Sequence, residues 1–115
     1  MSYEVPIYQS LKLLGVPASL KGYRYLTKAL TMELESPGAI GRMTKYMYPE
    51  IAKACATTSS RVERAIRHAV EVVFDRTDSG VIYDYFGNVS STSGKLTNTQ
   101  FIAAVAEHIR MEDKV

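Results

Sequence analysis

The sequence has almost no cysteine and no long apolar run, and each absence excludes a class of protein. A single cysteine, Cys55, cannot form a disulfide within the chain, so nothing argues for an oxidising compartment. The longest apolar run, about residues 101–106, is far shorter than the ~20 residues that a membrane-spanning helix needs. No basic segment followed by an apolar stretch opens the chain, as it does in a signal peptide. We therefore expect a cytoplasmic protein with no membrane contact.

Histidine is scarce too, with only two residues in the chain. Cys55 and His68 could be imagined as nucleophile and base, but Cys55 falls at a core position of its expected helix, and a buried, unactivated thiol is inert. Each histidine has one glutamate close by in the sequence, Glu71 for His68 and Glu107 for His108. Two ligands do not define a metal site. We therefore expect no enzyme, metal or other cofactor, and we interpret both histidines as surface residues.

Length and charge favour one small domain with a basic region. A chain of 115 residues, 46% of them apolar, can build one hydrophobic core, so we expect a single domain over residues 1–115. The net charge is only +2, but residues 42–68 hold six basic and two acidic residues, whereas residues 69–115 hold four basic and seven acidic ones. A local basic region suits a phosphate backbone, although a solvated charged face gives the same pattern.

Apolar residues recur at helical spacing, and no segment alternates like a strand. The fold class predicted from this pattern is all-α, a compact bundle of about six helices. We expect the helices over about residues 7–14, 19–35, 44–55, 60–76, 78–87 and 97–110, with a loop over 88–95. Pro49 leaves two options for the third helix: it begins near Thr44 with the proline inside, or near Tyr48 with the proline as its first helical residue.

The fourth expected helix has the clearest boundaries and the clearest apolar stripe. Ser60 and Glu63 form the Ser-x-x-Glu pattern of a capping box, although a start at Thr58 fits as well. Thr97 and Gln100 give a similar pattern for the last helix. The fourth helix carries a continuous apolar stripe that should face the core, made of Val62, Ala65, Ile66, Ala69, Val70 and Val73.

Residues 44–76 together predict a helix-turn-helix. Only residues 56–59 separate the third and fourth helices, a turn length typical of helix-turn-helix units. Small or apolar residues occupy the positions that such a unit buries between its helices, namely Ile51, Ala52, Cys55 and Val62. The turn has no glycine, so we expect it to consist of residues in ordinary backbone conformations.

The side of the fourth helix that faces away from its stripe is rich in hydrogen-bond donors. Arg61, Glu63 and Arg64 lie near its start, where a recognition helix reads base edges. Arginine can bind guanine O6 and N7, and glutamate can accept from cytosine N4, so we predict that these three residues read G·C pairs. We predict that phosphates are held by Lys45, Ser60, Arg67 and His68.

A solvated helix with ion pairs would also explain these charges. However, arginines near the positive end of a helix dipole cost stability, which favours a role in binding over a purely structural one.

The run from Thr57 to Glu71 closely resembles the recognition helix of the stage-zero sporulation protein A family, the master response regulator of endospore formation. The likeness covers nearly the whole chain after Ile7. It includes Gly15-Val16-Pro17-Ala18, Lys21-Gly22-Tyr23, Thr44-Lys45, Tyr48-Pro49, Ile51-Ala52-Lys53, Phe86-Gly87, Thr97-Asn98 and Phe101-Ile102-Ala103.

This resemblance implies a six-helix effector domain that binds a duplex DNA element similar to TGTCGAA and activates or represses promoters. It implies that Arg61, Glu63 and Arg64 read bases and that the four residues predicted above contact phosphates. It also implies that residues 101–110 help tandem molecules pair on DNA and that residues 81–86 approach the RNA polymerase sigma factor.

Two alternatives stay open. The receiver domain of that family is not part of this sequence, so the chain is either a solitary effector or a piece trimmed to one domain. The alternative function is a non-catalytic protein-interaction module on the same fold that has lost specific DNA binding.

Overall fold

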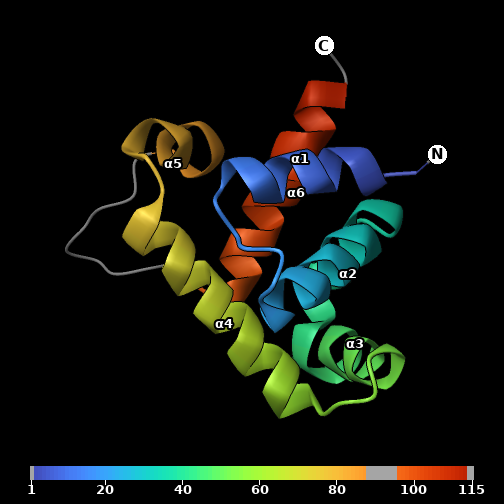
Figure 1. The fold of residues 1–115 in the computed structure, drawn as a ribbon. Coiled ribbons are helices and arrows are strands. Elements are labelled where there is room, and N and C mark those ends of the chain that lie inside the picture. Colours follow the sequence, from blue (N-terminus) through green and yellow to red (C-terminus); the bar gives the residue numbers. More distant parts are fainter. Residues whose placement is uncertain (1, 88–95, 114–115) are drawn as a thin grey trace.

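A computed structural model describes residues 2–87 and 96–113, and every regular element in these ranges is helical (Figure 1). This confirms the predicted all-α bundle of six helices. The predicted loop over residues 88–95 lies outside the described residues. The α-helices are α1 (Glu4–Leu13), α2 (Lys21–Glu35), α3 (Tyr48–Ala54), α4 (Ser59–Arg76), α5 (Ser79–Phe86) and α6 (Asn98–Asp113).

The last helix, α6, forms the centre of the bundle. It packs against α1, α2, α4 and α5, and Figure 1 shows it passing behind α1 and between α2 and α5. Its apolar face is buried and comprises Phe101, Ile102, Val105, Ala106 and Ile109. The predicted stripe of α4 is buried too, except that Ala65 is half-buried. No helix within the described ranges is long and apolar enough to cross a bilayer.

The approach to α3 combines both options that the sequence left open. A short 3-10 helix, η1 (Ala39–Arg42), leads into a single π-helical turn, η2 (Met43–Met47), which continues directly into α3. Tyr48 begins the α-helix, with Pro49 in its first turn. The wider π turn suits the proline, because Pro49 has no amide hydrogen to donate and its ring would clash with the carbonyl of Lys45 in an α-helix.

The turn between α3 and α4 corrects the prediction of ordinary backbone conformations. Ala56 has a φ of 54°, in the left-handed region. The amide of Ala56 donates to the carbonyl of Lys53 (3.5 Å), and the amide of Thr57 donates to the carbonyl of Ala52 (2.9 Å). These two bonds form a Schellman motif, whose left-handed position glycine usually fills. An alanine occupies that position here.

The start of α4 confirms one of the two caps that the sequence left open. Thr58, not Ser60, caps the helix: its backbone is extended, and its hydroxyl accepts from the amide of Arg61 at 3.2 Å. The proposed box between Ser60 and Glu63 is therefore wrong, because the chain enters the helix two residues earlier. The box at α6 is confirmed, since the amides of Thr97 and Gln100 each donate to the other's side chain, at 2.9 and 3.1 Å.

Helices α2 and α4 touch at a glycine. A Cβ added to Gly22 would lie 2.4 Å from the carbonyl oxygen of Ala65 and 2.9 Å from the Cβ of Ala69. No larger residue fits there without movement of one helix. The start of α2 is therefore held directly against the middle of α4.

Candidate nucleic-acid interface

The unit of α3, the turn and α4 is fixed from behind by the start of α6. The buried amide of Asn98 donates to the hydroxyl of Tyr48 at 3.0 Å and to the backbone carbonyl of Glu63 at 3.1 Å. Burial raises the pKa of Tyr48 above its ordinary value, although the bond from Asn98 acts in the opposite direction, so the phenol stays protonated at neutral pH. One side chain of α6 thus links the first residue of α3 to α4.

The predicted base-reading residues lie on the outer side of α4, near its start. Arg61 and Arg64 are exposed, whereas Glu63 is partly buried on the flank of the helix. Glu63 accepts a hydrogen bond from Arg67 at 3.2 Å. Two residues predicted to contact DNA are therefore paired with each other in the free protein. Such an exposed pair contributes only about 0.3–0.5 kcal/mol, so DNA could replace it at little cost.

A basic cavity lies where α4 meets α2. It has a volume of about 570 Å³ and is lined by Arg61, Arg64 and His68 from α4 and by Lys21 and Arg24 from α2. Residues of the turn complete its wall, and none of the described residues that line it is acidic. The structure therefore brings together two of the predicted base-reading residues and one predicted phosphate ligand.

The sequence reasoning missed Lys21 and Arg24. Their placement depends on the contact between α2 and α4, which the pattern of neither helix reveals. One local signal was present: both residues belong to the start of a helix that has no acidic residue in its first turn. Cations near the N-terminus of a helix cost stability, so the argument that favoured a binding role for the arginines of α4 applies to Lys21 and Arg24 as well.

The other predicted phosphate ligands lie outside this cavity. Ser60 and Arg67 are exposed on α4, and Ser60 is free of the capping role that the sequence gave to it. Lys45 belongs to η2 and lines a separate hollow of about 540 Å³, together with residues 40–44 and Thr99 of α6. The predicted phosphate contacts are therefore distributed over several elements and do not form one cluster.

Two residues considered for catalysis or metal binding differ from expectation. Cys55 is only half-buried, because it ends α3 beside the cavity and does not lie in the core. His108 is not a surface residue: its ring stacks on Tyr85 with centroids 3.9 Å apart, and its Nδ1 lies 3.4 Å from the carboxylate of Glu112. Over residues 2–87 and 96–113, no three side chains gather in a way that could hold a metal ion.

A comparison with known families adds to this geometry. Residues 7–109 match the model of the family described as sporulation initiation factor Spo0A, C terminal. The match begins in α1 and ends in α6, so it includes the α3–turn–α4 unit and both helices that line the basic cavity.

Proposed function

Because the chain belongs to the family of Spo0A C-terminal domains, we propose that it is a sequence-specific regulator of transcription that binds duplex DNA in a sporulation-related role. In this proposal the chain catalyses no reaction. The observation that carries it is the exposed face of α4, where Arg61 and Arg64 lie beside a basic cavity that no described acidic residue neutralises.

In this proposal α3–turn–α4 acts as a helix-turn-helix, and α4 enters the major groove. Arg61 and Arg64 can each donate two hydrogen bonds to guanine, and Glu63 can accept from cytosine N4 once it exchanges its partner Arg67 for the base. These residues suit an element similar to TGTCGAA, which contains G·C pairs. The bond from Asn98 to the backbone carbonyl of Glu63 supports a role of this part of α4 in binding, because it fixes the backbone there before DNA binds.

Phosphate contacts in this proposal come from Lys45, Ser60, Arg67 and His68, all of which are exposed. Their positions on η2 and along α4 would fix the register of the helix on the duplex without reading bases.

We also propose partners for the last two helices. No residue of α5 is fully buried, and Tyr83 is 64% exposed, so α5 offers a surface to the sigma factor of RNA polymerase. Pairing of tandem molecules through residues 101–110 must use the outer side of α6, around Glu107, because the apolar side of α6 belongs to the core.

Two single substitutions test the assignment of base and phosphate contacts. Arg61→Ala should weaken binding to the preferred element by about 1–3 kcal/mol and relax the preference at one base pair, measured by competition with singly altered duplexes. Lys45→Ala should weaken all duplexes similarly and reduce the salt slope by about one unit. If Arg61→Ala discriminated among these duplexes as well as the parent does, base reading by that residue would be wrong.

A further inference from the structure

The basic cavity between α2 and α4 contains more positive charge than base reading requires. Lys21, Arg24, Arg61 and Arg64 all line it, together with His68. We infer that Lys21 and Arg24 clamp the DNA phosphate backbone next to the bases that α4 contacts. This inference rests on the proposed function and adds a second helix to the DNA-binding surface.

The first support is the close approach of the two helices. Because Gly22 has no side chain, α2 meets α4 at the backbone of Ala65. Lys21 immediately precedes the contact, and Arg24 lies half a turn beyond it. Their side chains therefore line the same cavity as Arg61 and Arg64.

The second support is electrostatic. No ion pair joins Lys21, Arg24, Arg61 or Arg64 to any acidic residue within the described ranges. The start of α2 adds to the positive potential, since Leu20 provides no side-chain cap and the first turn contains no acid. Four neighbouring cations without a counter-charge repel each other, and an anion in the cavity would relieve this repulsion.

The chemistry of these side chains favours a phosphate. Lysine offers a point charge, and arginine offers a planar fork that matches phosphate oxygens. The position beside Arg61 and Arg64 makes the backbone of the DNA they would read the nearest anion. Backbone contacts carry no sequence information, so the clamp should strengthen binding to every duplex equally.

The test compares two double variants in DNA-binding titrations over a series of salt concentrations. Lys21→Gln/Arg24→Gln removes the clamp, and Lys12→Gln/Lys28→Gln removes the same charge at positions that line no part of the cavity. Each lost phosphate contact reduces the magnitude of the slope of log K against log salt by about 0.9. The slope of the clamp variant should therefore be smaller than that of the parent by about 1.8, on the specific and on the scrambled duplex. The control variant should keep the slope of the parent.

Duplexes with a neutral methylphosphonate at one position at a time locate the contact. At one or two positions the methylphosphonate should weaken the parent about threefold or more and leave the clamp variant unaffected. If every position weakened both proteins equally, the cavity would not hold a DNA phosphate, and the inference would be overturned, even if inorganic phosphate bound there.

The outcomes separate this inference from the proposed function. A parent that prefers the specific duplex, with a clamp variant whose slope is unchanged, overturns the clamp and leaves the proposed function intact. A parent that binds neither duplex overturns the proposed function and the clamp with it.

Discussion

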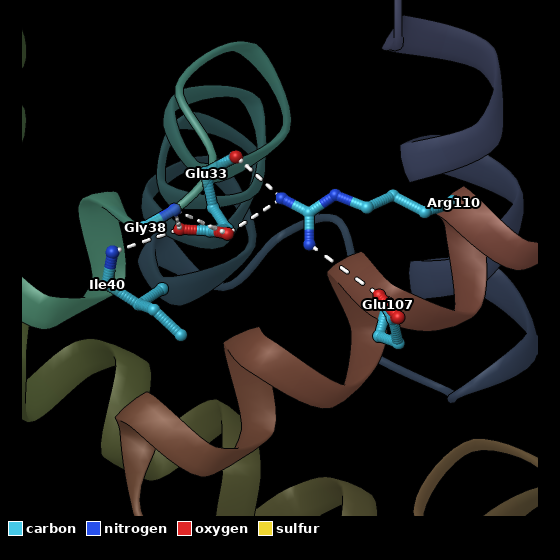
Figure 2. A network of polar contacts seen from close by, with 5 residues as sticks. All are labelled: Glu33, Gly38, Ile40, Glu107 and Arg110. Atoms are coloured by element: carbon cyan, nitrogen blue, oxygen red, sulfur yellow. Dashed lines mark hydrogen bonds and ion pairs between the residues drawn. The ribbon is translucent and has the colours of Figure 1, made fainter.

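Glu33 is the one charged side chain that the described ranges bury, and three hydrogen-bond donors satisfy its carboxylate and backbone carbonyl (Figure 2). The amides of Gly38 and Ile40 donate to the carboxylate at 3.2 and 3.0 Å. Arg110 of α6 donates to the carboxylate at 2.7 Å and to the carbonyl of Glu33 at 2.8 Å. Glu33 therefore joins the end of α2 and the start of η1 to α6.

These contacts make stability depend on pH. Burial alone would raise the pKa of Glu33, but the bonds from Arg110, Ile40 and Gly38 and the charge of Arg110 lower the pKa below its ordinary value of 4.5. A carboxyl whose pKa is lower in the folded than in the unfolded chain stabilises the fold fully above the unfolded value. That stabilisation is lost as the pH falls through the folded value.

Glu33→Gln should therefore lower the free energy of unfolding at pH 7 by about 1–3 kcal/mol. The difference from the parent should shrink as the pH falls below 4.5, because protonated Glu33 resembles glutamine. Urea titrations between pH 7 and pH 3 measure this. Glu107→Gln is the control. Because Glu107 is 61% exposed and 3.8 Å from Arg110, its substitution should change the free energy of unfolding by less than about 0.5 kcal/mol. A difference for Glu33→Gln that did not change with pH would contradict the account.

The left-handed backbone of Ala56 should also affect stability. Its left-handed backbone costs an alanine about 1–2 kcal/mol, whereas glycine adopts it freely. Glycine also adds about 0.4–1 kcal/mol of unfolded-chain entropy, which offsets part of the gain. Ala56→Gly should therefore raise the free energy of unfolding by about 0.5–1 kcal/mol.

The matched control is Ala54→Gly, at the exposed end of α3, which should lower stability by about 0.5–1 kcal/mol. Thermal unfolding distinguishes the two variants. If Ala56→Gly destabilised the protein as much as Ala54→Gly does, the left-handed turn would be wrong.

Among the contacts between helices, that of α2 with α4 positions the candidate site. Gly22→Ala would gain about 0.5–1 kcal/mol in helix propensity. The new Cβ would lie 2.4 Å from a backbone carbonyl, which cannot rotate away, so α2 must shift. We expect a net loss of about 1–3 kcal/mol.

Denaturant midpoints test this against Gly41→Ala, where an added Cβ meets no atom within 4 Å and stability should change by less than about 0.5 kcal/mol. Equal effects of the two substitutions would mean that α2 and α4 are not in close contact.

The elements also show what the sequence could predict. Apolar periodicity identified the helices and the buried stripe of α4, because burial of one face imposes that spacing. It did not fix the start of α4, because Thr58 and Ser60 are both good caps and only the backbone decides between them. It did not predict the backbone of Ala56, since a Schellman motif with alanine in place of glycine breaks the usual rule.

On the scale of the whole molecule, charge is separated along α4. The basic cavity lies near the start of this helix. Helix α5 follows the far end of α4 (Figure 1). Asp78 and Asp84 are exposed in and beside α5. In our proposal, DNA bound at the start of α4 would leave α5 accessible to a protein partner.

The candidate site was predictable only in part for a related reason. Arg61, Glu63 and Arg64 share one helix, so their spacing alone places them together near its start. Lys21 and Arg24 are some 40 residues away in the chain, and only the tertiary contact at Gly22 brings them to the same cavity. The sequence therefore predicted the site residues that share α4, but it did not predict the basic residues that α2 adds to the cavity.

The central claim is sequence-specific binding of duplex DNA, and fluorescence anisotropy tests it most directly. The measurement compares a duplex that carries two tandem TGTCGAA-like elements with a scrambled duplex, at two salt concentrations. We predict a preference of about 10³-fold or more for the specific duplex. Equal, strongly salt-dependent binding to both duplexes would reduce the function to charge attraction, and no binding to either would indicate a protein-interaction module; each result would contradict the claim.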